Sequence, residues 1–162
     1  MSFLIKNKKK KKNIFGIIST ALIFLIVLYG MKVYLTRSVD IKKLYAIKKI
    51  VFVGKNRFKV MTAVNPAEWK QGLMDIKKLH KNTGMFFIFP KKVDYPFWMK
   101  NTLIPLTVLF INKNKVVNQI KMTPCVTKKC LFYYPFVYYR QALEINQTNK
   151  NLIGKKIKTG GI

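Results

Sequence analysis

Acidic residues are nearly absent from this chain. Its 162 residues include 5 Asp plus Glu and 32 Lys plus Arg, so the formal net charge is +27 at pH 7. There are also only one histidine and two cysteines. Acid–base, nucleophilic and metal chemistry each need several such side chains close together. The sequence therefore predicts no metal site and no cofactor, and it does not indicate a reaction.

Cysteine and glycine, at 2 and 8 residues, are too few for a disulfide-dense mini-protein or a collagen. Hydrophobic residues make up 50% of the chain and aromatic residues 14%. This is enough apolar material for a core, and it excludes disorder throughout. The length suits one modest domain with an appendage.

Residues 14–31 contain no charged side chain. A helix of this length would be roughly 27 Å long, close to the thickness of the hydrocarbon layer of a bilayer. Six lysines precede it and predict a cytoplasmic basic tail over residues 1–13, because positive charge resists translocation. We expect an uncleaved signal anchor in the inner or plasma membrane, with the rest of the chain periplasmic or extracellular. A cleaved signal peptide is the alternative.

The rest of the chain is basic as well. Residues 1–37 hold eight of the 32 basic residues and none of the five acids, so residues 38–162 have a net charge of +19. Such a charge favours an anionic lipid or an anionic envelope polymer as partner. We expect no nucleic-acid partner, because only three of the basic residues are arginine and export would separate the domain from nucleic acid.

A connector over residues 32–49 leads to short apolar runs that are separated by turn signals. The runs at 50–53 and 58–64 flank Gly54 and predict a hairpin. Residues 112–115 are the expected turn of a second hairpin. Further strands are expected at 84–89, 97–99, 106–111, 116–122, 136–145 and 157–159.

One helix is predicted among these strands. Asn65 suits the N-cap, Pro66 suits the first helical position, and Glu68 completes a capping box. The prediction is a compact β-rich α+β domain over residues 50–162 with one short helix near 66–76, preceded by a single transmembrane helix.

The order of several motifs resembles one family. They are NPAEWKQGLM at 65–74, GMFFIF at 84–89, FWMKNTLIPLTVLFI at 97–111, MTPC at 122–125 and ALEIN at 142–146. On these motifs the chain is similar to the domain of unknown function 192 family, which comprises uncharacterised conserved membrane or secreted proteins. The resemblance extends from about residue 50 to the C-terminus. It implies a small β-rich exported domain whose biochemical role is not established.

The chain departs from the family pattern at several charged positions. Thr107 and Asn112 stand where the family usually has Asp, and Ile76 replaces a basic residue. Gly160 and Gly161 stand in place of a late Gly-Asp, and the final strand of the family is expected to be lost or shortened. Any family site that uses those carboxylates lacks them in this chain.

The two cysteines, Cys125 and Cys130, are close together in the sequence. Their spacing fits neither a zinc ribbon nor a CxxC redox pair. In an exported domain we expect them to form a local disulfide. Two free thiols are the alternative, if strain or a reducing compartment keeps them apart.

A group of five polar residues is the candidate binding site. Lys100, Asn101 and Thr102 follow an aromatic strand, and Glu144 and Asn146 belong to a later strand. Side-chain alternation lets Lys100 and Glu144 approach each other if the two strands are neighbours, so the group could line a small cleft. The alternative is a structural network in which Lys100 neutralises a partly buried Glu144.

Three functions are compatible with these features. The first is a membrane-anchored binding or accessory domain of the cell envelope that has no catalysis of its own. The second is an enzyme that acts on envelope material and uses Lys100 and Glu144 as acid and base. The third is an electrostatic tether to anionic lipid or wall polymer. The first two differ in whether Lys100, Asn101 and Glu144 converge in an open pocket.

Overall fold

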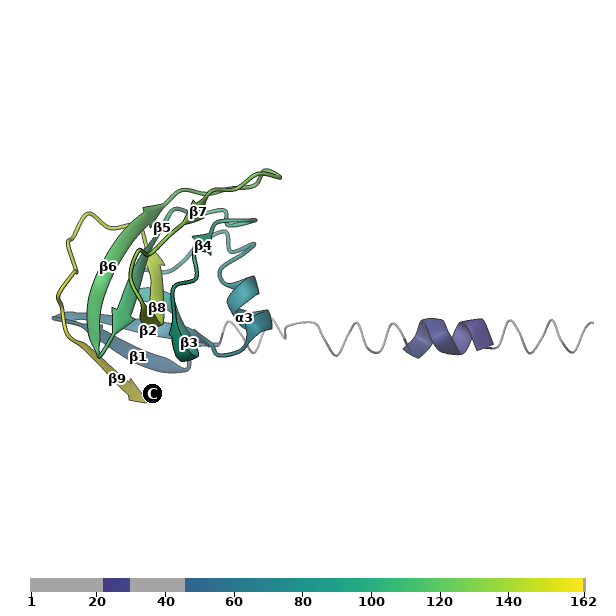
Figure 1. Ribbon diagram of the computed structural model, residues 1–162, viewed down its shortest axis with the longest axis horizontal. Helices are drawn as coiled ribbons and strands as arrows, with labels where there is room; N and C mark the ends of the chain where they lie inside the picture. Colours follow the sequence, from purple (N-terminus) through teal and green to yellow (C-terminus); the bar gives the residue numbers. More distant parts are fainter. Residues whose placement is uncertain (1–21, 30–45, 162) are drawn as a thin grey trace, which may run out of the picture. The chain divides into compact units, whose positions relative to one another are not determined.

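The computed structural model describes residues 22–29 and 46–161, and residues 22–29 are helical (Figure 1). They cover part of the predicted span at 14–31. The rest of that span, the tail at 1–13 and most of the connector lie outside the described residues. Within the described ranges, no helix is long and apolar enough to cross a bilayer, so the anchor stays a prediction. The helix and the folded domain are separate units, and each is described by itself.

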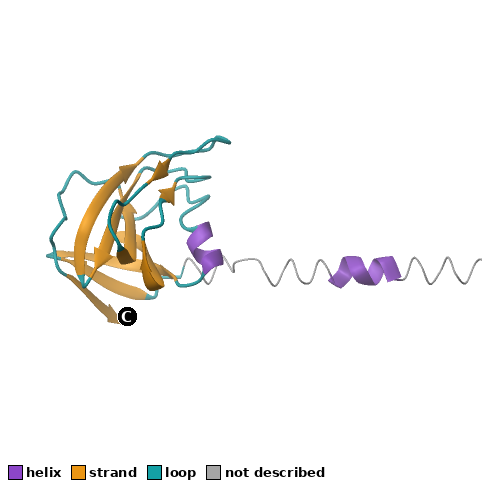
Figure 2. Ribbon diagram, in the orientation of Figure 1, coloured by secondary structure: helices purple, strands orange, loops and turns teal. Residues whose placement is uncertain are grey.

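Strands dominate the folded domain, which spans residues 46–161 and contains one short helix (Figure 2). This confirms the predicted β-rich α+β class. The helix is α3 (Pro66–Gln71), and the strands are β1 (Lys49–Val53), β2 (Asn56–Ala63), β3 (Thr83–Val93), β4 (Phe97–Trp98), β5 (Leu106–Asn112), β6 (Lys115–Met122), β7 (Phe132–Tyr133), β8 (Tyr139–Asn146) and β9 (Ile157–Gly161).

Both predicted hairpins are present. β1 and β2 pair antiparallel on either side of Gly54, which has a φ of 58°. β5 and β6 pair antiparallel across Lys113 and Asn114, whose φ values are 48° and 57°. Positive φ at both central residues is what a two-residue turn needs to match the twist of its strands. The turn residues therefore set the register of the second hairpin.

The helix α3 begins where the sequence predicts and ends earlier. The Asn65 side chain accepts a hydrogen bond from the Glu68 amide (3.0 Å), and the Glu68 carboxylate accepts one from the Val64 amide (2.7 Å). Gly72 follows the last helical residue with a φ of 47°, a conformation that glycine adopts at little cost. The predicted boundary at residue 76 was too late because Gly72 stops the helix.

Seven strands form one sheet in the order β6-β5-β8-β3-β2-β1-β9, and β4 pairs with β7 in a separate ribbon. β2 and β3 are parallel, while the other pairs are antiparallel. The parallel pair needs a crossover connection, and α3 lies in it. β9 pairs with β1 along its whole length, so the strand expected at 157–159 is present and extends to Gly161.

The sheet separates two apolar cores. Leu143 and Ile145 of β8 belong to an inner core made by strand residues and Leu152, whereas Ala142 belongs to an outer core. The long strands are strongly curved (Figure 1), and Lys115 at the start of β6 forms a bridge to Lys156 just before β9. The curved sheet thus wraps around the inner core. The outer core includes Leu73, Phe97 and Met99, which lie outside the seven strands.

Cys125 and Cys130 form a disulfide with a Cα–Cα distance of 5.9 Å, which confirms the predicted pairing. Replacing both cysteines with serine is expected to lower the free energy of unfolding by about 2 kcal/mol, because the short closed loop restricts the unfolded chain. Equilibrium denaturation of the parent and the double variant measures this difference. Reduction of the parent chain should have the same effect. Equal stability of reduced and oxidised chains would contradict the prediction.

Candidate functional site

The structure does not bring Lys100 and Glu144 together. Lys100 is exposed, and its Nζ lies over the Trp98 ring at 5.5 Å from the centroid. Glu144 is 4% exposed, and in the described domain no ion pair joins it to Lys100. The reason is topological, because β4, which precedes Lys100, pairs with β7 rather than with β8. The expected pair, whether catalytic or structural, is therefore not formed.

Asn101 and Thr102 complete a turn after β4. Asn101 has a φ of 53°, and its carbonyl oxygen accepts a hydrogen bond from the Asp75 amide (2.9 Å). Thr102 is buried, and its hydroxyl donates to the Lys100 carbonyl oxygen at 3.4 Å. The turn fixes the chain beside α3 and leaves Thr102 facing inward and Lys100 facing solvent.

Asn146 lies at the end of β8, where its side-chain amide donates to the carbonyl oxygens of Leu79 and His80 at 3.0 and 3.3 Å. These bonds attach the segment before β3 to the sheet. Asn146 also borders a separate cavity of about 430 Å³ that includes Lys81 and Lys150. Of the five predicted site residues, the structure therefore places Thr102 and Glu144 at one cavity and Asn146 at another.

Glu144 points away from the inner core, opposite to Leu143 and Ile145, as alternation along β8 predicts. Its Oε2 atom is buried and has no hydrogen-bond partner. Burial penalises the charged form and raises the pKa of Glu144 from 4.5 to about 8. At neutral pH the carboxyl group is therefore mostly protonated and can both donate and accept a hydrogen bond.

Glu144 and Thr102 border a pit of about 20 Å³ beneath the C-terminal end of α3. A Cβ atom built on Gly72 would lie 3.9 Å from Glu144 Oε2 and 3.6 Å from Phe87 Cζ. The chain therefore passes directly over the carboxyl group at this residue. A space of this size can hold one water molecule or one small polar group of a ligand.

An aromatic cleft of about 250 Å³ adjoins this pit. The cleft and the pit are adjacent, because they share several lining residues, namely Trp69, Lys70, Phe87, Phe97 and Trp98. Lys70 is the charged side chain that borders the cleft. The other lining residues are Phe89, Tyr95, Pro96 and Tyr139.

The walls of the aromatic cleft are held in place. The Trp69 indole Nε1 donates to the Ala63 carbonyl oxygen at 3.1 Å, and its ring packs on Phe89 at a centroid distance of 4.8 Å. The Phe87 and Phe97 rings meet edge to face at 5.1 Å. Such contacts fix ring orientation, so the cleft is preorganised for a ligand.

The aromatic residues of the cleft were not predicted as site residues. They come from α3, β3, β8 and the segment around β4, and the crossover between β2 and β3 carries α3 to this position. In the sequence they look like ordinary core residues. Across the described residues, no group of three or more His, Cys, Asp or Glu side chains is arranged to hold a metal ion.

Two solved structures resemble this chain. One is a protein from Sinorhizobium meliloti 1021 proposed as a transcription regulator, with 23% identity and a TM-score of 0.61; the match covers 73% of this chain and 97% of that one. The other is a protein of unknown function from Novosphingobium aromaticivorans DSM 12444, with 26% identity and a TM-score of 0.60. This match covers 75% of the present chain and 90% of that one. The likeness supports the fold. No functionally curated protein matches the sequence.

The family comparison agrees with the motif order. Residues 49–158 match the family model DUF192, described as "Uncharacterized ACR". The match includes every strand from β1 to β8, the helix α3, and the residues that line the aromatic cleft and the pit. The chain therefore belongs to the domain of unknown function 192 family.

Proposed function

We propose that the chain is a non-catalytic binding domain of the cell envelope, anchored by its apolar N-terminal segment, and that it binds a neutral glycan in the aromatic cleft. The observation that carries this proposal is the unpartnered Oε2 atom of Glu144 in the pit that opens from the cleft. A buried polar atom of this kind calls for a partner, which a ligand can supply.

The chemistry of the cleft favours a sugar ring as ligand. Trp69 and Trp98 contribute apolar ring surface to the cleft wall, against which the C–H groups of a pyranose ring can pack. The pit has room for a single hydroxyl or amide group, which can hydrogen-bond to the protonated Glu144 carboxyl. A neutral ligand fits best, because an ionised group would lose its hydration beside a neutral carboxyl.

Binding fits the arrangement better than acid–base catalysis. Lys100 faces solvent, whereas Glu144 is buried. The pKa of Glu144 is raised by burial, and no charged group contributes to the shift. A general acid and a general base must both reach the same reacting atoms. Glu144 and Thr102 can orient a ligand. Lys70 also borders the pit, but it is exposed and is not among the causes of the raised pKa of Glu144.

A location outside the cytoplasm rests on two features. Residues 14–31 are apolar and follow six lysines, which is typical of an anchor with a cytoplasmic N-terminus. The disulfide between Cys125 and Cys130 adds support, because such bonds persist in oxidising compartments. A glycan of the envelope would then be within reach of the cleft.

The test is a titration of the full-length chain, in neutral detergent, with a trisaccharide of N-acetylglucosamine. This probe is neutral and offers ring faces, hydroxyls and amides. At about ten times the dissociation constant it should stabilise the fold by about 1.4 kcal/mol and raise the melting temperature by several degrees.

Three variants distinguish the cleft from other surfaces. Trp98→Ala and Glu144→Leu should each abolish the shift, whereas Phe52→Ala, which removes an exposed ring on β1, should retain it. The proposal fails if the trisaccharide gives no shift in the parent chain, or if the shift survives in both cleft variants.

A further inference from the structure

The segment between the disulfide and β8 has many exposed apolar side chains. Residues 126–138, which we call the aromatic loop, include Phe136 with 89% of its surface accessible. A contiguous apolar surface on a folded domain marks an interaction site. The exposed apolar side chains of the loop are Val126, Leu131, Phe132, Tyr134, Phe136 and Tyr138.

The rings of the aromatic loop form one continuous row. Phe132 stacks on Trp98 with a centroid distance of 6.0 Å and an interplanar angle of 11°. Tyr134 contacts Phe132 at 6.5 Å and Phe136 at 6.3 Å. The exposed rings are therefore a single surface connected to β4.

The backbone of the aromatic loop is fixed at several points. The disulfide closes one end, and the Asn118 side chain donates to the carbonyl oxygen of the buried Pro135 at 2.7 Å. Phe136 has a φ of 53°, which is unfavourable for a bulky side chain. The fold thus holds the Phe136 ring in solvent against both backbone strain and the hydrophobic effect.

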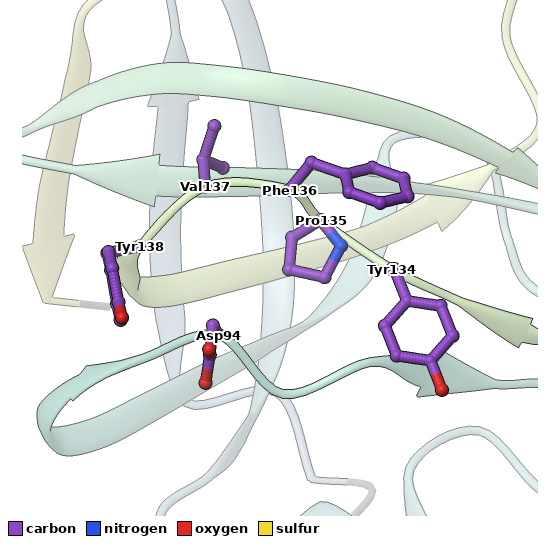
Figure 3. Close-up of a pocket in the computed structure, with 6 residues that line it drawn as sticks. All are labelled: Asp94, Tyr134, Pro135, Phe136, Val137 and Tyr138. Atoms are coloured by element: carbon purple, nitrogen blue, oxygen red, sulfur yellow. The ribbon is translucent and has the colours of Figure 1, made fainter.

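The acidic residue that borders the aromatic loop is Asp94. It lines a pocket of about 220 Å³ with residues 134–138. Figure 3 shows Tyr134 and Tyr138 extending toward the segment that carries Asp94, while Val137 points to the opposite side. Asp94 is therefore placed beside the second half of the loop, and residues 126–131 take no part in that pocket.

The first half of the loop is positively charged. Lys128 and Lys129 are exposed inside the ring that the disulfide closes, and Lys100 lies over Trp98. Residues 95–143 contain no Asp or Glu. The aromatic loop therefore combines exposed rings with positive charge.

We propose that the aromatic loop docks on the surface of an anionic lipid bilayer. Phe132 and Phe136 enter the boundary between headgroups and acyl chains, where aromatic rings concentrate. Lys128 and Lys129 contact the lipid phosphates. A second copy of the chain fits poorly as the occupant, because docking would bring these lysines toward an equally basic surface. The contact does not depend on the glycan proposed for the cleft.

The test uses the full-length chain in vesicles of about three parts phosphatidylcholine to one part phosphatidylglycerol, with brominated acyl chains as quenchers. Phe136→Trp places a reporter in the loop, and Phe52→Trp places a matched reporter on β1 in the same tethered chain. Relative to the parent, the reporter at residue 136 should shift its emission to the blue and be quenched at least about twofold more than the one at 52.

The charge contribution is tested in the same vesicles. Lys128→Gln with Lys129→Gln should lower the ratio of docked to free loop by about thirtyfold and remove the extra quenching. High salt, or vesicles of pure phosphatidylcholine, should weaken docking of the loop to a similar extent. Equal quenching at 136 and 52 would overturn the proposal. A blue shift at 136 without lipid quenching would also overturn it, and would favour a second copy of the chain as the occupant.

Discussion

A Glu144→Gln variant is expected to be more stable than the parent chain at pH 8 and about equally stable at pH 4. In the folded domain, burial raises the pKa of Glu144 from 4.5 to about 8, whereas the unfolded chain ionises near 4.5. Between these values the folded state holds a proton that the unfolded state releases. Rising pH therefore favours unfolding by up to about 1.4 kcal/mol per unit, or about 5 kcal/mol across the window.

Glutamine does not titrate and has nearly the same shape as glutamate. The stability of the Glu144→Gln variant should therefore depend much less on pH between 5 and 8 than that of the parent chain. Denaturation of the full-length chain in neutral detergent at several pH values measures the effect. Asp75→Asn serves as the control, because Asp75 is exposed and its φ of 64° also suits asparagine. A parent chain that is as stable at pH 8 as at pH 5 would show that Glu144 is not held neutral.

Gly84→Ala is expected to destabilise the domain by about 3 kcal/mol. Gly84 lies in β3 opposite Ile145 of β8. An added Cβ would collide with the backbone carbonyl oxygen of Glu144, and it would also lie 3.1 Å from Ile145 Cγ2 and 3.2 Å from Leu143 Cδ1. A backbone atom cannot move aside without disturbing the hydrogen bonds between the two central strands.

Gly160→Ala is the matched control for this prediction. Gly160 also lies in a strand, but an added Cβ there would have no atom within 4 Å. Its effect should stay within about 0.5 kcal/mol. Equilibrium denaturation of both variants gives the comparison. Equal effects of the two substitutions would mean that β3 and β8 can separate locally at little cost.

Local parts of the fold could be predicted because they depend on neighbouring residues. The cap by Asn65, the turn at 112–115 and the disulfide of Cys125 each involve partners within five positions. The order of the strands could not be predicted. Apolar alternation identifies β2 and β3 as strands, but nothing local indicates that they are parallel or that β8 lies between β3 and β5.

The candidate site was predictable only in part, for the same reason. Alternation along β8 gave the direction of Glu144 correctly. Lys100 does not lie near Glu144, because β4, which precedes Lys100, pairs with β7 in the separate ribbon. The walls of the cleft depend on the crossover that carries α3 over the sheet. Contacts between residues distant in the sequence therefore decided that Glu144 Oε2 has no hydrogen-bond partner.

The pairing of β1 with β9 must be a late step in the folding of this domain during synthesis. β1 and β2 are adjacent in the chain and can pair soon after both leave the ribosome, but β9 is synthesised about a hundred residues later. Until then the outer edge of β1 presents free amides and carbonyls beside the side chain of Phe52. Such an edge recruits other strands and promotes aggregation. A nascent chain is therefore most vulnerable before Ile157 arrives, and chaperones that mask this edge would matter most in that interval.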